Sequence, residues 1–214
     1  MASLLLIAEL LVWLALGHAT KTTAIQTAVG ILEVTPAQTA GPFYPLVKPD
    51  DRDNDLTIVA DAAGVAEGNV LQLNGILLWE EGGTPVAGAT VEIWQADNRG
   101  IYMHPNALGA EGRDPNFQSY GETTTDADGL LGFRTVIPAQ YSSRPRHIHV
   151  KVLVGGIERL TTQIYFRGDP NLATDAVFKS TGSSGQLLLI DPIDCKGGNV
   201  LAADHTIVLQ GGGV

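Results

Sequence analysis

Short segments in which apolar and polar side chains alternate recur along the chain from Val70 onward. The clearest covers residues 89–95, and Val70–Trp79 is a longer segment rich in apolar residues. Because side chains of a β-strand point alternately to opposite faces, this period of two predicts strands with one buried face. Turn-forming Gly, Pro, Asp and Asn separate the segments. Since helical periodicity is weak outside the N-terminus and residues 171–179, we expect an all-β fold, a β-sandwich with long loops and a short N-terminal helical segment.

The remaining segments divide into strands and irregular stretches. Further strands are expected at residues 56–59, 122–125, 130–136, 147–154, 160–166, 186–190 and 205–209. Residues 35–45 contain three prolines and a glycine, which forbid a regular helix or a central strand, so they predict an ordered extended arm. Residues 103–121 form a polar loop long enough to indicate a functional role.

The composition narrows the class of protein. With 214 residues, 44% of them hydrophobic, the chain can bury one large core. A net charge of −10 repels phosphate backbones, so nucleic acid is not an expected partner. The single cysteine, Cys195, excludes an intrachain disulfide and a cysteine-rich zinc site.

The N-terminal residues form an apolar run over 4–16, interrupted only by Glu9. The run is too short for a confident transmembrane helix, and the small residues Gly17 and Ala19 after it fit a secretory signal. No Lys or Arg precedes the run, so an amphipathic helix packed on the domain is the alternative. We therefore divide the chain into residues 1–34, an apolar segment and linker, and residues 35–214, the main domain; export is favoured over a cytoplasmic location.

Two histidines on one predicted strand are the first candidates for a chemical site. His147 and His149 are two residues apart, so both point to the same face and can offer imidazole nitrogens to one metal ion. Taken alone, a hydrogen-bonded histidine pair on a sheet is equally expected. Tyr102 and Tyr141 add two phenolate donors, and this hard donor set suits trivalent iron better than zinc or copper.

Six segments, taken in order, carry a family resemblance. They are QTAGPFYP at 38–45, VEIWQAD at 91–97, GIY at 100–102, FRT at 133–135, RPRHIH at 144–149 and QIYF at 163–166. Together they resemble the intradiol ring-cleavage dioxygenases, most closely the protocatechuate branch of that family. The resemblance covers about residues 35–175.

The resemblance implies a non-haem Fe(III) enzyme on a prealbumin-like β-sandwich. Such an enzyme inserts both atoms of O2 between the two hydroxyl-bearing carbons of a catechol and forms a cis,cis-muconate. Position by position, Tyr102 resembles the retained tyrosinate ligand and Tyr141 the tyrosinate that substrate displaces, while His147 and His149 resemble the imidazole ligands. The implied partners are a small catechol and O2, and a homo-oligomer is left open.

Three further residues are assigned through the same resemblance. Arg144 and Gln163 match residues behind the ligands, where Arg144 either stabilises developing negative charge or holds a structural ion pair. Tyr44, in the arm, is expected to line the substrate pocket. Only Ser142 and Ser143 separate Tyr141 from Arg144, fewer residues than in close relatives. We therefore expect a wide pocket that turns over neutral catechols at least as well as protocatechuate.

An alternative from another class stays open. Residues 83–91 and 125–129 also resemble a prealbumin-like β-sandwich module that only binds other molecules, in which case no iron is present and the four ligands are coincidental. A cupin is set aside because no glutamate follows within a few residues of His149. His104 and His205 are expected to be surface or loop residues.

Overall fold

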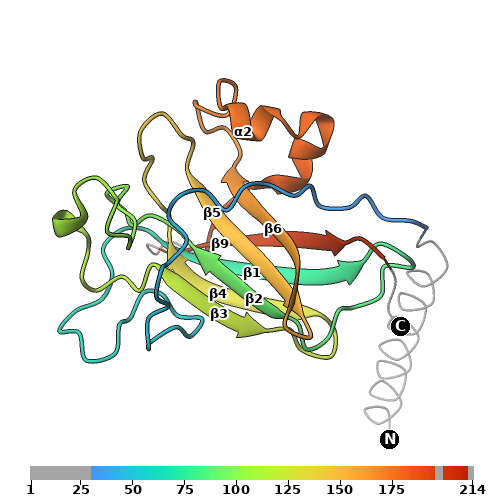
Figure 1. Ribbon diagram of the computed structural model, residues 1–214, viewed down its shortest axis with the longest axis horizontal. Helices are drawn as coiled ribbons and strands as arrows, with labels where there is room; N and C mark the ends of the chain where they lie inside the picture. The colour runs from blue at the N-terminus through green and yellow to red at the C-terminus, as the bar shows by residue number, and fades with distance from the viewer. Residues whose placement is uncertain (1–29, 196–199, 212–214) are drawn as a thin grey trace, which may run out of the picture.

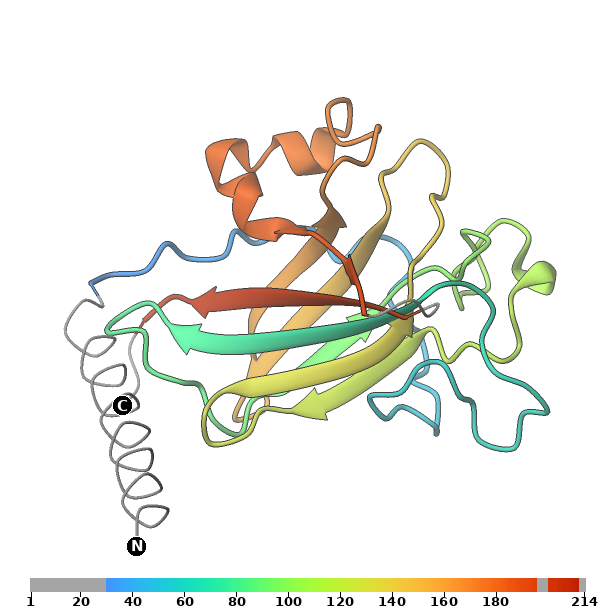
Figure 2. The same ribbon diagram turned by 180° about the vertical axis from the view of Figure 1, so that it is seen from behind.

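Two β-sheets face each other as a sandwich, which confirms the all-β prediction (Figures 1 and 2). The computed structural model describes residues 30–195 and 200–211. One sheet has the strand order β4-β1-β9-β8 and the other the order β3-β2-β5-β6-β7. The strands are β1 (Val70–Trp79), β2 (Thr90–Trp94), β3 (Tyr120–Thr124), β4 (Leu130–Val136), β5 (His147–Val154), β6 (Ile157–Phe166), β7 (Leu189–Ile190), β8 (Ile193–Asp194) and β9 (Val200–Leu209).

The core lies between the sheets and determines which way the histidines point. Ile148, Val150 and Val152 of β5 are almost fully buried and belong to this core. Because neighbouring side chains of a strand point to opposite faces, His147 and His149 lie on the outer face of the second sheet. Burial of these apolar side chains thus fixes β5 so that both histidines lie on its outer face.

The predicted arm crosses that outer face. Residues 30–50 contain no strand, and they run along the second sheet in Figure 1. The amide of Gln38 donates to the carbonyl of Thr161 in β6, and the side chain of Lys48 pairs with Glu92 of β2 at 2.6 Å. The arm is therefore fixed to the sheet at both ends and covers the histidines.

Several predicted elements differ in extent from those of the structure. Residues 56–59 contain one isolated bridge, between Ile58 and Val65, rather than a strand. Residues 186–190 are mostly the 3-10 helix η2 (Gly182–Leu188), and a second such turn, η1 (Ala110–Gly112), lies in the long loop. The helix expected within 171–179 is only α2 (Ala176–Lys179), because the carboxylate of Asp175 caps it by accepting the amide of Phe178.

The expectation that His104 and His205 are surface or loop residues is wrong for His205, and for His104 it holds only in that the residue lies in a loop. Each is only 7% exposed. His104 does lie in the long loop, but its ring packs against Phe43 with centroids 5.6 Å apart. His205 lies in β9 and lines a small space between the sheets, beside Gly75 of β1. Alternation along β9, which places Ala203, His205 and Ile207 on one face, is the signal that marks it as inward.

Replacing His205 with leucine should make the fold less sensitive to acid. Burial lowers the pKa of His205 to about 4, whereas the unfolded chain has a value of about 6.5. The unfolded state therefore binds the proton more tightly than the folded state. The free energy of unfolding is unaffected by this group above about pH 6.5, and it falls by about 1.4 kcal/mol per pH unit as the pH drops from there towards 4. Urea unfolding of the metal-free wild type and the His205→Leu variant, between about pH 7 and about pH 4, measures how steeply the free energy of unfolding depends on pH. Equal slopes would contradict the assignment.

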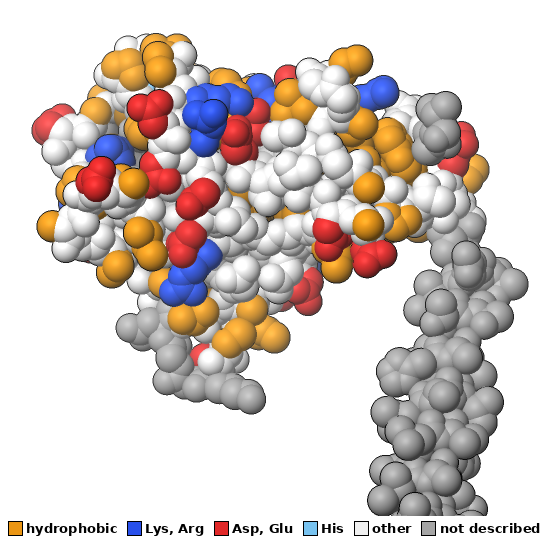
Figure 3. Space-filling model, turned by 90° about the horizontal axis from the view of Figure 1, so that it is seen from below, with side chains coloured by type: hydrophobic (Ala, Val, Ile, Leu, Met, Phe, Trp, Pro, Cys, Tyr) orange, Lys and Arg blue, Asp and Glu red, His pale blue; other side chains and the backbone are white. Residues whose placement is uncertain are grey.

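No helix within residues 30–195 and 200–211 is long and apolar enough to cross a bilayer. On the face in Figure 3, Asp and Glu side chains are scattered among apolar ones. The N-terminal apolar segment, its proposed helix and its cleavage site lie outside the described residues, and the division at residue 34 stays a prediction.

Candidate metal centre

The structure brings the four predicted ligands together. The rings of His147 and His149 are 4.9 Å apart between centroids, and those of Tyr102 and Tyr141 are 5.2 Å apart. The Tyr102 hydroxyl lies 3.1 Å from Nε2 of His147, and the Tyr141 ring lies 5.7 Å from the His147 ring. Two imidazoles and two phenols therefore converge beneath the arm.

The imidazole of His147 is oriented by a backbone hydrogen bond. Its Nδ1 lies 2.7 Å from the carbonyl oxygen of Pro145, an atom that can only accept. Nδ1 therefore carries the hydrogen, and the lone pair of Nε2 faces the Tyr102 hydroxyl. Histidines that bind metals commonly have their second nitrogen fixed in this way.

A buried turn places Tyr102. The carboxylate of Asp97, fully buried, accepts hydrogen bonds from the amides of Arg99 and Ile101 and from that of Asp114 in the long loop, each at 2.9 Å. Gly100 has φ +84°, and a side chain there would collide with the carbonyl oxygen of Gln140. The turn thus presses Tyr102 against the segment that carries Tyr141.

Tyr141 lies in the half-buried turn that enters β5. Its carbonyl accepts the amide of Arg144 at 3.1 Å, and Ser142 between them has the left-handed φ of 53°. The short connection therefore closes as a tight turn. Phe43 packs edge-on against the Tyr141 ring, at 5.5 Å between centroids, and stacks on Tyr102 at 4.9 Å.

His149 is held by stacking instead of by a hydrogen bond. Its Nδ1 is buried and has no hydrogen-bond partner among the described residues. Trp94 is its neighbour across the β2–β5 pair, and the two rings are almost parallel, 4.7 Å apart at an angle of 5°. A buried nitrogen without a partner is unusual.

Burial keeps both imidazoles neutral and so available as ligands. It lowers the pKa of His147 to about 4 and the pKa of His149 well below its ordinary value. Burial likewise raises the pKa of the Tyr102 phenol well above its ordinary value, so in the absence of a cation this group keeps its proton.

The donor set fits a hard, trivalent metal ion. No three His, Cys, Asp or Glu side chains gather as a metal site within the residues that the structure describes, so the two phenols are needed to complete one. Two phenolates and two neutral imidazoles offer two negative charges, and one hydroxide would neutralise Fe(III). We conclude that these residues fit non-haem iron.

Arg144 and Gln163 lie in a hydrogen-bonded network next to the centre. Arg144 pairs with Asp175 at 2.5 Å and donates to Oε1 of Gln163 at 2.9 Å. The Tyr165 hydroxyl donates to Oε1 of Gln38, and its oxygen lies 3.0 Å from Oε1 of Gln163. Because Gln163 pairs with His149 and Tyr165 with His147 across the β5–β6 ladder, this network supports the outer face that carries the histidines.

Tyr44 is not at the ligand cluster, whereas Phe43 is. The Tyr44 hydroxyl donates to Glu92 at 2.8 Å, and its ring packs edge-on against Trp94, one layer behind His149. The neighbouring Phe43 instead contacts Tyr102 and Tyr141. Alternation along an irregular arm could not show which of the two aromatic residues reaches the centre.

Removing the indole behind His149 should weaken metal binding. We expect Trp94→Leu to lower iron affinity by about tenfold, the range seen when a partner of a metal ligand is lost, while Trp94→Phe, which keeps a ring, retains most of it. Competition with a chelator measures the affinity. A parallel fall in the two variants would show that bulk, not stacking, orients His149.

Comparisons with known proteins identify the family of the chain. A family model described as Dioxygenase matches residues 39–211. The chain is 36% identical over 170 residues to the protocatechuate 3,4-dioxygenase beta chain of Burkholderia cepacia, which covers 74% of this chain and 72% of that one. It is 30% identical over 198 residues to catechol 1,2-dioxygenase 1 of Acinetobacter lwoffii, covering 83% of this chain and 60% of that one.

Solved structures show the same fold. The dioxygenase domain of a carbohydrate-binding fusion protein from Streptomyces sp. SirexAA-E superposes with a TM-score of 0.65 at 30% identity, covering 83% of this chain and 99% of that one. An intradiol ring-cleavage dioxygenase from Tetranychus urticae gives a TM-score of 0.67 at 22% identity, covering 84% and 95%, which supports the fold alone. With its sandwich and its matched domain, the chain belongs to the intradiol ring-cleavage dioxygenase family.

Proposed function

We propose that this protein is a non-haem Fe(III) dioxygenase that uses O2 to open the ring of catechol-type diols between the two hydroxyl-bearing carbons. The observation that carries the proposal is the convergence of Tyr102, Tyr141, His147 and His149. When bound there, the iron would act as a Lewis acid that favours loss of the two catechol protons, and the catechol would be electron-rich because it is then a dianion.

The residues of the chain have separate tasks in this proposal. Tyr141 lies in a half-buried turn, and as the tyrosinate that the metal would hold it could take one proton from the catechol as substrate enters. The guanidinium of Arg144, fixed by Asp175, supplies positive charge beside the centre. Phe43 covers the two phenols with its ring and keeps bulk water from them.

Iron content and colour test the proposal. We expect the purified protein to hold one Fe(III) per chain, to be burgundy to red through tyrosinate charge transfer, and to consume one O2 per catechol cleaved. Metal analysis, the visible spectrum and oxygen uptake measure these. A colourless protein that stays inert after iron is added would favour the binding module without iron.

A further inference from the structure

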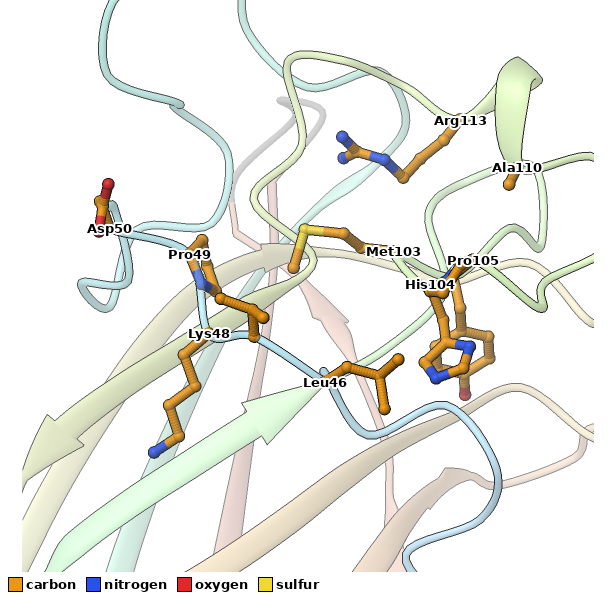
Figure 4. A pocket seen from close by; sticks show the side chains of 11 residues that line it. Leu46, Lys48, Pro49, Asp50, Met103, His104, Pro105, Ala110 and Arg113 are labelled. Carbon is orange, nitrogen blue, oxygen red and sulfur yellow. The ribbon is translucent and has the colours of Figure 1, made fainter.

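Tyr141 is the least buried of the four candidate ligands. The other three are at most 3% exposed, whereas Tyr141 is half-buried. The cavity between residues 46–50 of the arm and residues 103–113 of the long loop gives no way into the centre (Figure 4). Tyr102 is the one candidate ligand among the residues that line this cavity, and it is 2% exposed. A molecule that enters the centre from solvent therefore meets Tyr141 first.

The turn that carries Tyr141, residues 140–146, has one side open to solvent. The two serines at its tip are exposed, and so is Gln140. An open cleft of about 710 Å³ is lined by Gln140 and Arg146 together with residues 137–139. Because no apolar side chains cover the turn on this side, polar contacts must hold it in place.

One buried carboxylate holds both ends of this turn. The side chain of Asp169 is 0% exposed, and its Oδ1 accepts a hydrogen bond from the side-chain amide of Gln140 at 3.0 Å. Its Oδ2 accepts the backbone amide of Arg146 at 3.2 Å and Nε of the same residue at 2.8 Å. Gln140 directly precedes Tyr141, and Arg146 directly precedes His147. The contacts of Asp169 therefore lie on both sides of Tyr141.

Asp169 is itself fixed in the turn that follows β6. Its Oδ1 also accepts the backbone amide of Asn171 at 3.0 Å, and its own backbone amide donates to the carbonyl of Phe166 at 3.1 Å. Burial alone would raise the pKa of Asp169, but hydrogen bonds from Arg146 and Asn171 hold this pKa below its ordinary value. The carboxylate is therefore ionised, and its two oxygens can accept all these hydrogen bonds at once.

We propose that Asp169 is a positioning residue for Tyr141, which fixes the backbone on both sides of the tyrosine so that the phenol reaches or leaves the metal by rotation of its side chain alone. The inference rests on the proposed function and deepens it, since it names the group that holds the ligand nearest to entering substrate. In the described part of the chain, Asp169 has no hydrogen bond to any of the four ligand side chains, so it acts through Gln140 and Arg146. A fixed backbone returns the phenol to the same place after each turnover.

Hydrogen exchange of the metal-free protein tests this role of Asp169 without iron. The backbone amide of Arg144 donates to the carbonyl of Tyr141 at 3.1 Å, so its exchange rate reports opening of the turn. Asp169→Asn replaces one accepting oxygen with a donor that faces other donors. We expect it to speed the exchange of this amide about tenfold, the factor for one lost charge-assisted hydrogen bond. Amides of β1, in the opposite sheet, should keep their rates.

Gln140→Ala is a milder variant that keeps the buried carboxylate. Because Gln140 is exposed, the fold should be unaffected, and exchange of the Arg144 amide should become about threefold faster. Gln186→Ala is the matched control, since it also removes an exposed glutamine that is bonded to a charged side chain, that of Arg167 at 3.1 Å, but in η2. It should leave the rate unchanged. Wild-type exchange in both Asp169→Asn and Gln140→Ala would overturn the inference.

Measurements on the iron-loaded protein separate positioning from a structural role. Per iron bound, Asp169→Asn should lose part of the tyrosinate charge-transfer absorption, because Tyr141 is no longer held at the metal. Catechol then meets less competition from Tyr141, so KM should fall, and kcat should fall about tenfold because the proton acceptor is displaced. A structural role alone would lower the amount of active enzyme and leave KM and the absorption per iron unchanged, and this result would also overturn the inference.

The two sets of measurements distinguish the inference from the proposed function. Faster exchange in Asp169→Asn, in a protein that takes up no iron, would support the hold of Asp169 on the turn and refute the dioxygenase proposal. A coloured and active enzyme in which neither the exchange rate nor KM responds to Asp169→Asn would leave the dioxygenase proposal standing and refute the inference.

Discussion

Replacing His147 with alanine is expected to reduce iron affinity by more than about a hundredfold, because it removes a neutral donor from a set of only four protein ligands. The protein should lose its colour on dialysis and bind no substrate at the centre. Iron analysis and the visible spectrum after dialysis against a weak chelator measure the loss. His149→Ala should cause a similar loss of iron, since its ring lies beside that of His147 on the same face of β5.

A buried histidine elsewhere provides the matched control for this loss. His205→Leu also removes a buried imidazole, but from β9 of the opposite sheet, so it should keep full iron content. The control separates loss of a ligand from general damage to the fold. Full iron and activity in both His147→Ala and His149→Ala would place the metal site elsewhere.

Arg144→Gln is expected to cost both stability and turnover. The side chain of its partner Asp175 is only 3% exposed, so removing the cation leaves a buried carboxylate without its counter-charge. Breaking such a pair costs about 3 kcal/mol. Turnover should fall about a hundredfold, as for one lost charge-stabilising group, while iron stays bound because no ligand is removed.

A double variant separates the two roles of Arg144. Asparagine at position 175 can still accept the amide of Phe178 and cap α2, but it carries no charge. We therefore expect Arg144→Gln with Asp175→Asn to recover most of the stability and none of the turnover. Urea unfolding and steady-state oxygen uptake give the two values. If turnover returns together with stability, Arg144 acts only as a structural ion pair.

The sandwich and the ligand strand could be predicted because alternation is a local property of the sequence. Val70–Trp79 and Leu130–Val136 were bounded correctly, and the shared face of His147 and His149 follows directly from their spacing. The path of the arm across the second sheet could not be predicted in this way. Its path depends on contacts with residues far along the chain, such as Gln38 with Thr161, and no local period encodes them.

Of the side chains that support the ligands, Arg144 and Gln163 were predicted, but others were missed for a related reason. Trp94 and Tyr165 reach the histidines only through strand pairing, and once β2 and β6 are placed beside β5 their positions follow. Asp175 left a weak local signal, an acidic residue immediately before a short apolar segment, which is typical of a helix cap. Phe43 left none, because its neighbour Tyr44 is equally aromatic.

The parallel pairing of β1 with β9 has a consequence for how the chain folds. Val70 pairs with Val200, and Trp79 with Leu209, so the middle of the first sheet joins segments from the two ends of the domain. During synthesis, β1 can pair with β4 early but waits for its other neighbour until the last strand has left the ribosome. Such long-range pairing slows folding and leaves an open strand edge in the meantime. A chain that stops before Val200 would keep that edge permanently, and its fate is aggregation rather than a smaller working domain.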